Sequence, residues 1–462
     1  MLIRRLRVAL VLLLLSSGYF SHAFEALPLR INCVNVNDDL ALIADLSESG
    51  QLRREARKFV VKAFDYNEDK PFSDYLAYAR EKILAENPKA EMLCPITTPT
   101  SQLLYPELDN DLQQVVDLVA PFELARPNAD SVVLLIHGLT DSPFLFHDMA
   151  HEFFQNGLDV RTLLLPGHGT APSALIETNE RKWRQATRYA IRQALKDYKR
   201  VYLGGFSTGG TLIWDQLNTG TWSQTELAKI AGLMMWAPAS KAKSDMAWVA
   251  KYVDYLPFVD WLNKGADIDF AKYESFPFNA AAQVHTLMSR VNGNSKSLTR
   301  IPDIPLLVVA SEVDQTIETK TTLSLMRQWH NAPGRMSQSL DTLIFYGNEA
   351  VVAQLPDSLA VLRPACQNQQ LCDKVIDISH NAALNAPTNP HYGYQGNYKY
   401  CEHHIGSDAF SACKTMAVVP TGEISGRNLD KYGVMRRLTF NPYFDHMREQ
   451  VLGFVTKTGI KP

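Results

Sequence analysis

The sequence has no excess of basic residues and no C-x-x-C pair, and each absence removes a class of function. Its 46 lysines and arginines are outnumbered by 49 acidic residues, which gives a formal net charge of -3. A chain with this balance lacks the basic surface that nucleic-acid-binding domains use to hold phosphates. Without C-x-x-C spacing, nothing indicates a zinc site. We therefore expect no nucleic-acid partner, no metal and no organic cofactor.

The N-terminal segment lacks acidic residues, and its apolar run is too short to span a membrane comfortably. Arg4, Arg5 and Arg7 precede an apolar run over Val8–Phe20, and small residues end the segment at Ala23. This order is typical of a secretory signal peptide, over residues 1–23, whose removal would change the formal net charge from -3 to -6. The residue directly after Ala23 is not a cysteine, so nothing indicates a bacterial lipid anchor. We expect an exported protein, periplasmic or secreted; an uncleaved N-terminal membrane anchor is the alternative.

The cysteines fit an exported chain, because their number is even and disulfides persist in oxidising compartments. Their spacing favours three pairs: Cys366 with Cys372, Cys401 with Cys413 and, by remainder, Cys33 with Cys94. Free buried thiols are the alternative.

The most informative stretch is Gly205-Phe206-Ser207-Thr208-Gly209-Gly210. An apolar run, Val201–Leu203, precedes it, and a helical pattern begins near Thr211. A serine exposed at a sharp turn between strand and helix needs glycine two residues before and two after, because the turn crowds the backbone. The turn places Ser207 at a helix N-terminus, where the N–H of Thr208 can stabilise an oxyanion. The pattern predicts a nucleophile elbow; a glycine-rich turn with a solvated serine is the alternative.

Continuous apolar runs around the elbow are typical of strands buried on both faces of a parallel sheet. Helical patterns separate these runs, and Trp183–Leu195 carries one apolar face of a long helix. Alternating strands and helices predict an α/β fold with a doubly wound parallel sheet and a site at the carboxyl ends of its strands. The predicted strands are 132–136, 160–165, 201–203, 230–236 and 304–310.

Three motifs in this order carry a specific resemblance. His137-Gly138 follows a strand, Leu-Pro-Gly-His-Gly occupies 165–169, and the elbow lies at 205–210. Together they resemble the α/β-hydrolase fold, and in particular its monoacylglycerol lipases, lysophospholipases and small carboxylesterases. The resemblance covers roughly residues 130–384 and the final helix after Asn441. It implies that the N–H groups of Leu139 and Thr208 form an oxyanion hole and that His137 orients the first loop.

This fold places its acid and base after the nucleophile, in the order Ser, Asp or Glu, His. The loop that leaves the 304–310 strand offers Asp314, with Glu312 as the alternative acid. Val375–Ile378 is predicted as the last core strand, and His380 directly after it is the expected base. His391, His403 and His404 are the competing histidines. A metal at Glu402-His403-His404 is a weaker alternative to a solvated loop.

Three segments are predicted to lie outside the core. Residues 24–125 are expected to form an N-terminal helical extension, with helices over Leu52–Phe64 and Phe72–Leu84, and residues 126–462 the hydrolase domain. Two amphipathic patterns within 240–300 resemble the helical lid of the monoacylglycerol lipase group. A second insertion at 385–440 precedes a closing helix expected to be capped by Asn441.

The sequence predicts a serine hydrolase that cleaves carboxylic esters of apolar acyl chains through a Ser207-His380-Asp314 triad. The expected partner is a small-molecule or lipid ester, and contact of the lid with a membrane surface is a further hypothesis. A peptidase resembling proline aminopeptidases and a catalytically inactive binding protein are the alternatives. The sequence leaves the natural substrate and the oligomeric state open.

Overall fold

The fold is described from a computed structural model. The description covers residues 31–49, 55–56, 61–108, 112–244, 259–292 and 301–459. The predicted signal peptide and the first amphipathic pattern of the lid, residues 246–253, lie outside the described residues.

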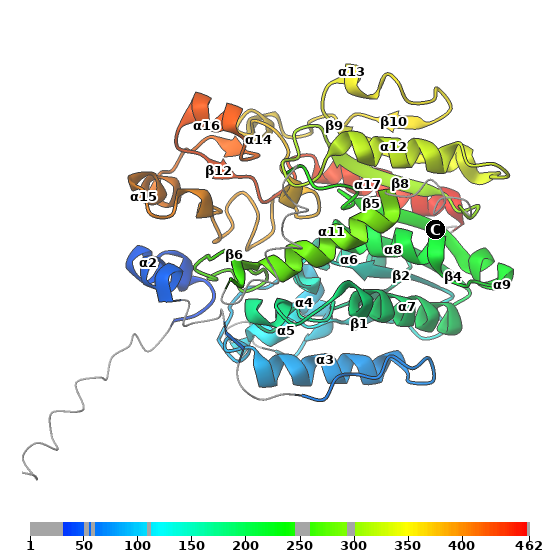
Figure 1. Cartoon of the computed structure of the whole chain (residues 1–462), viewed down its shortest axis with the longest axis horizontal. Coiled ribbons are helices and arrows are strands. Elements are labelled where there is room, and N and C mark those ends of the chain that lie inside the picture. The colour runs from blue at the N-terminus through cyan, green and yellow to red at the C-terminus, as the bar shows by residue number, and fades with distance from the viewer. Residues whose placement is uncertain are drawn as a thin grey trace, which may run out of the picture.

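A single sheet of eight strands organises the chain (Figure 1). Its order is β1-β3-β2-β4-β5-β8-β9-β10, with β1 antiparallel to β3 and every other pair parallel. Each predicted core strand before residue 311 lies within three residues of its expected limits. The strands are β1 (Glu123–Leu124), β2 (Ser131–Ile136), β3 (Asp159–Leu163), β4 (Arg200–Phe206), β5 (Ile230–Trp236), β8 (Leu306–Ser311), β9 (Thr342–Tyr346) and β10 (Ala360–Leu362).

Helices cover both faces of the sheet, as a doubly wound parallel sheet requires. Alternate residues of β2 explain the two layers: Val132, Leu134 and Ile136 enter one hydrophobic cluster, and Val133 and Leu135 the other. On the first face lie α7 (Glu180–Asp197), α8 (Thr208–Thr219) and α12 (Thr319–His330). On the second face lie α6 (His147–Gln155) and α17 (Phe444–Thr458).

The N-terminal extension packs directly against this core and does not form a separate unit. Its helix α3 (Phe72–Glu86) agrees with the predicted one and contributes Tyr75, whose hydroxyl donates to the carbonyl oxygen of Leu164 at 2.8 Å. The helix predicted over Leu52–Phe64 is wrong for its described residues, since 55–56 and 61–64 have no helical structure. Phe64 instead packs against Tyr75 and Tyr189. The extension also contains α2 (Leu40–Ser49), α4 (Pro99–Leu104) and α5 (Val115–Val119).

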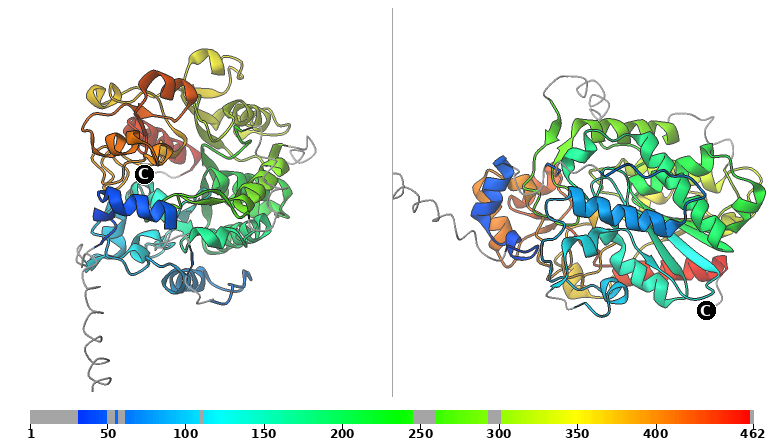
Figure 2. Two further views of the ribbon diagram at one scale, coloured as in Figure 1. Left: turned by 60° about the vertical axis from the view of Figure 1, so that its left-hand side comes forward. Right: turned by 90° about the horizontal axis from the view of Figure 1, so that it is seen from below.

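The second insertion lies at one end of the molecule, beside α2 (Figures 1 and 2, orange and blue). Asn397 of this insertion donates to the carbonyl oxygen of Cys33 at 3.4 Å, which ties the two segments together. The insertion contains short elements: α15 (Asp408–Thr415), β11 (Thr421–Gly422), α16 (Gly426–Tyr432) and β12 (Arg436–Arg437). The three predicted disulfides are present, at Cys33–Cys94, Cys366–Cys372 and Cys401–Cys413.

Two predictions near the C-terminal end of the chain need correction. Val375–Ile378 is not a core strand: Val375 forms only an isolated bridge with Thr421, and β10 is the last strand of the sheet. Asn441 precedes the closing helix without capping it, because α17 begins at Phe444. The side-chain amide of Asn441 instead donates to the hydroxyl of Tyr346 at 2.8 Å.

The remaining elements connect these layers. They include α9 (Gln224–Lys229), β6 (Trp261–Asn263), β7 (Phe276–Pro277), α11 (Phe278–Asn292), α13 (Glu349–Val352) and α14 (Gln369–Cys372). Within the described part of the chain, no helix has the length and hydropathy of a membrane span.

Candidate active site

Ser207 lies in a strained turn between β4 and α8. Its backbone angles are φ 49° and ψ -114°, in a region that residues other than glycine rarely occupy. Two backbone hydrogen bonds connect the turn with β5 and the loop after it. Ser207 N–H donates to the carbonyl oxygen of Trp236 at 2.9 Å, and Ala239 N–H donates to the carbonyl oxygen of Ser207 at 3.0 Å. A Cβ at Gly205 would collide with the backbone of Gly210, and one at Gly209 with the carbonyl oxygen of Ile136. The two glycines are therefore a steric requirement of this elbow.

Three predicted site residues form one hydrogen-bonded chain. His380 Nε2 lies 3.1 Å from Ser207 Oγ, and His380 Nδ1 lies 2.6 Å from Asp314 Oδ2. All three side chains are buried, with 3–7% of each residue exposed. This is the spacing expected of a nucleophile, a base and a carboxylate that orients the base.

The carboxylate of Asp314 is held in its charged form. Burial acts to raise its pKa, but the electrostatic attraction and hydrogen bond between Asp314 and His380 oppose this effect, as do the N–H groups of Ile317 and Thr316. The net result is a pKa below the ordinary value of Asp. Glu312, the alternative acid, is directed elsewhere: its carboxylate accepts from the N–H of Asn348 at 2.7 Å. The structure therefore places Asp314, and not Glu312, beside His380.

Leu139 and Thr208, the predicted oxyanion donors, line the same cavity as Ser207. Thr208 is the first residue of α8, so its N–H has no acceptor within the helix. Two buried histidines brace the loop that carries Leu139. Thr140 N–H donates to His168 Nε2 and Leu165 N–H donates to His137 Nε2, each at 3.0 Å.

Both of these histidines stay neutral at ordinary pH. Burial lowers the pKa of His137 to about 4 and that of His168 to about 3. Because each Nε2 accepts a hydrogen bond, the ring proton resides on Nδ1. These histidines hold the loop and do not contact Ser207, as the sequence predicts for His137.

A cavity of about 600 Å³ opens on Ser207 and His380. Its apolar wall includes Phe278, Val284 and Met288 of α11 and Leu262 of β6. Its opposite wall is polar, with Asp141, Lys272, Asn381, Tyr400 and Arg437.

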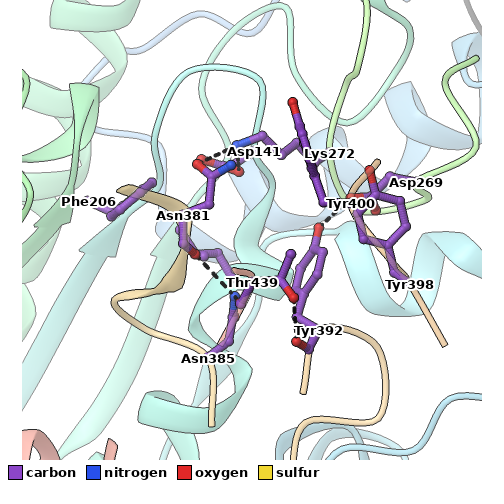
Figure 3. Close-up of a pocket in the computed structure, with 11 residues that line it drawn as sticks. Asp141, Phe206, Asp269, Lys272, Asn381, Asn385, Tyr392, Tyr398, Tyr400 and Thr439 are labelled. Atoms are coloured by element: carbon purple, nitrogen blue, oxygen red, sulfur yellow. Dashed lines mark hydrogen bonds and ion pairs between the residues drawn. The ribbon is translucent and has the colours of Figure 1, made fainter. Parts of the chain in front are cut away.

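Figure 3 shows part of the polar wall, where Lys272 lies between Asp141 and Asn381. The ammonium group of Lys272 is 2.9 Å from the carboxylate of Asp141 and donates to the side-chain oxygen of Asn381 at 3.4 Å. Since Asn381 follows His380 in the chain, this ion pair connects the oxyanion loop with the histidine loop.

The sequence analysis did not identify Glu423 and Arg437, which connect the loop of Asp314 with the loop of His380. Glu423 Oε2 accepts from His380 N–H at 3.0 Å and from Gln315 N–H at 3.4 Å. Arg437 is paired with Glu423 at 2.9 Å and donates to the hydroxyl of Thr316 at 3.1 Å. Both residues come from the second insertion, where no motif signals their role.

The competing histidines lie away from Ser207. His391 is fully buried and paired with Asp269 at 3.0 Å, in a cluster that also receives the hydroxyl of Tyr392. His403 donates to the carbonyl oxygen of Met435 at 3.1 Å, and Met435 N–H donates to His404 at 3.4 Å. Within the described residues, no group of three His, Cys, Asp or Glu side chains is arranged to hold a metal ion.

One family of known proteins matches the chain by sequence. Residues 133–361 match the sequence model of the alpha/beta hydrolase family. This match and the mostly parallel eight-stranded sheet show that the chain belongs to the α/β-hydrolase superfamily. None of the curated proteins compared with the chain matches it.

Several solved structures are similar to about half of the chain. A structure of the metagenome-derived lipolytic enzymes LipS and LipT is 21% identical over 50% of this chain and 88% of its own, with a TM-score of 0.40. Monoglyceride lipase from Saccharomyces cerevisiae is 14% identical over 49% and 81%, with a TM-score of 0.41. Monoacylglycerol lipase from Paleococcus ferrophilus is 16% identical over 49% and 88%, with a TM-score of 0.38.

Proposed function

We propose that the protein is a serine hydrolase that cleaves carboxylic esters of apolar acyl chains. The observation that carries the proposal is the hydrogen-bonded chain from Ser207 through His380 to Asp314 at the base of a cavity with an apolar wall. Serine hydrolysis needs a nucleophile with an adjacent base, and the base needs a partner that fixes its orientation. The family match agrees with this chemistry.

In the proposed mechanism, Ser207 Oγ attacks the ester carbonyl carbon while His380 Nε2 takes the hydroxyl proton. The N–H groups of Leu139 and Thr208 stabilise the negative oxygen of the tetrahedral intermediate. His380 then gives its proton to the departing alcohol, which leaves an acyl group on Ser207. Water, activated by the same histidine, attacks this acyl group, and the intermediate that forms releases the carboxylic acid and restores the serine.

The apolar wall is proposed to receive the acyl chain. Phe278, Val284 and Met288 project from α11, within the segment that the sequence analysis assigned to a lid over 240–300. Burial of apolar surface stabilises a complex by about 25 cal/mol per Å². A longer acyl chain covers more of this wall and should bind more tightly in the transition state.

Glu423 and Arg437 are proposed to position the triad. One buried carboxylate fixes the backbone of His380, and the guanidinium group paired with it fixes Thr316, two residues after Asp314. Together they would hold the base and the acid at their observed separation. Neither residue needs to contact the reacting ester.

The peptidase alternative is less favoured by the polar wall. A free amino terminus requires an acidic partner, but Asp141, an acid in the lining of the cavity, is already paired with Lys272. Glu274, a further acid in the lining, is also a poor partner: burial, followed by the charges of Asp269 and Asp267, raises its pKa to about 7.

Export is proposed from the signal-like segment, and the three disulfides are consistent with an oxidising compartment.

The proposed function can be tested with chromogenic esters of graded acyl length. The Ser207→Ala variant should lose hydrolysis of every ester by a factor on the order of 10⁶ in kcat, because the nucleophile is removed. Ser289→Ala is a suitable control, since Ser289 belongs to α11 and its hydroxyl donates to the carbonyl oxygen of His285 in the same helix. Activity of Ser207→Ala within tenfold of the parent protein would contradict the assignment.

A further inference from the structure

A second cavity, of about 620 Å³, lies in and beside the second insertion and does not include Ser207 or His380. We call it the basic cavity, because five of its lining residues are cationic and only Asp373 is acidic. The cations are Lys374, Lys399, Lys431, Arg436 and Arg437. They come from separate segments: the turn after α14, the loop before Cys401, helix α16 and strand β12.

Four of these cations, all except Arg437, have no carboxylate within 4 Å in the described part of the chain. Their contacts are neutral oxygens and aromatic rings instead. Lys374 donates to the hydroxyl of Tyr394 at 2.6 Å, and Lys399 to the carbonyl oxygen of Gly396 at 2.7 Å. Lys431 lies over the ring of Tyr432 at 4.8 Å from its centre.

Backbone carbonyls fix Arg436 in place. Its guanidinium group donates to the carbonyl oxygens of Cys413 and Met416, each at 2.7 Å. A guanidinium group that is already ordered loses less entropy when it binds an anion.

The cations of the cavity repel one another, and only Arg437 among them is paired with a carboxylate in the described part of the chain. Burial, and then the charges of Arg436 and Lys414, lower the pKa of Lys399 from its ordinary value. Burial likewise lowers the pKa of Arg436. An anion in the cavity would relieve this repulsion.

Aromatic side chains complete the lining and favour an organic ligand over a bare ion. Tyr394, Tyr400 and Tyr432 are among the residues that line the cavity. Val418 belongs to the same lining and is 79% exposed. Lysine and arginine side chains converging from several directions suit the oxygens of a phosphate group. Tyrosine rings suit the carbon skeleton that carries it.

We propose that the basic cavity binds a phosphate group carried by an organic ligand or by a lipid. The site goes beyond the proposed hydrolase function and does not depend on it. Tyr400 and Arg437 line both cavities, so a bound phosphate would lie next to the polar wall of the catalytic cavity.

The test uses the full chain and two phosphate probes, one a soluble phosphate monoester and the other a lipid phosphodiester. Isothermal titration with glycerol 3-phosphate measures a soluble source, with glycerol as the neutral control. Sedimentation with vesicles of phosphatidylglycerol measures a lipid source, with phosphatidylcholine vesicles as the zwitterionic control. Binding of either phosphate probe should weaken as salt rises, because the interaction is electrostatic.

The double variant Lys374→Gln with Lys431→Gln removes two exposed cations from the cavity and should weaken binding at least tenfold. Lys320→Gln with Lys457→Gln is the matched control, because these exposed lysines lie on α12 and α17 and the net charge changes equally. The circular-dichroism spectra of both double variants should match that of the parent protein. Binding of glycerol 3-phosphate alone would identify a soluble ligand, and binding of the anionic vesicles alone a lipid.

Two results would overturn the proposal. The first is no binding of either phosphate probe at low salt. The second is binding that the two double variants weaken equally, since this would reflect net charge rather than the cavity. Neither result would alter the expectation for Ser207, so failure of this site and failure of the hydrolase proposal remain distinguishable.

Discussion

The lid segment and the second insertion border the same catalytic cavity but offer it different chemistry. From the lid, α11 presents Phe278, Val284 and Met288, which are apolar. The second insertion presents Tyr400 and Arg437, with the carboxylate of Glu423 buried behind them. Under the proposed function, the two additions have different roles: the lid segment would contact the acyl chain, and the second insertion would hold the loops of Asp314 and His380.

This division leaves the chemistry to the core. Substitutions in the triad should therefore lower kcat more than substitutions in the lid segment or in the second insertion. Asp314→Asn should lower kcat by about 10⁴, because an amide presents the wrong hydrogen-bonding group to His380. Glu312→Gln is the matched control and should stay within a few-fold of the parent, since its side chain contacts Asn348. Steady-state hydrolysis of a short chromogenic ester measures both. A reversed order of the two effects would identify Glu312 as the acid.

The triad could be predicted from sequence because each of its parts has a local signal. Gly205 and Gly209 are required by the elbow, and Asp314 follows a continuous apolar strand. His380 lies between Ser207 and Asp314 in the fold, although the strand predicted before it is wrong. Val375–Ile378 has strand-like residues, but Ile376 N–H bonds to Thr421 of the second insertion rather than to the sheet. The prediction of His380 as the base therefore rests on the resemblance of its loop to that of the family, and not on a strand.

Glu423 could not be predicted in this way. Its partners are His380 N–H, Gln315 N–H and Arg437, which are separated from it by 43, 108 and 14 residues. Backbone N–H groups carry no sequence signature, so their acceptor is visible only in the fold. Strands β9 and β10 were likewise not predicted. Strand β10 is short and partly exposed at the edge of the sheet, whereas β9 is a buried run as long as β3, so its sequence signal was present and was overlooked.

The role of the second insertion can be tested at its buried carboxylate. Glu423→Gln should lower kcat about 10- to 100-fold with little change in KM, because a hydrogen bond to a charged group contributes about 1.5–3 kcal/mol. Asp408→Asn, an exposed acid of the same insertion, should leave kcat within twofold. Glu423→Asp should recover part of the loss if the carboxylate is what matters. A change confined to KM or to the melting temperature would assign Glu423 a different role.

The role of the lid can be tested on its apolar wall. Val284→Ala with Met288→Ala should lower kcat/KM for long acyl esters roughly tenfold more than for acetate, because less apolar surface is buried. Val259→Ala is the control in the same segment, since Val259 is 38% exposed and does not line the cavity. Equal losses across the ester series would mean that α11 only supports the site.

The smallest effect concerns the buried histidines behind the oxyanion loop. The pKa of His168 is about 3 in the fold, so between pH 6.5 and 3 the unfolded chain binds a proton that the folded chain does not. This histidine therefore costs stability progressively as pH falls through that window. His168→Gln should reduce the slope of unfolding free energy against pH there by up to about 1.4 kcal/mol per pH unit. Urea titrations at several pH values measure it, and an unchanged slope would contradict a buried neutral imidazole.

The most direct test of the central claim is covalent labelling with a fluorophosphonate probe, read by intact mass and peptide mapping. A serine activated by His380 should form one adduct, on Ser207, and the Ser207→Ala variant should form none. Asp314→Asn should label far more slowly, and Glu312→Gln at the parent rate. No adduct on the folded protein, or an adduct on another serine that persists in Ser207→Ala, would contradict the assignment of Ser207 as the nucleophile.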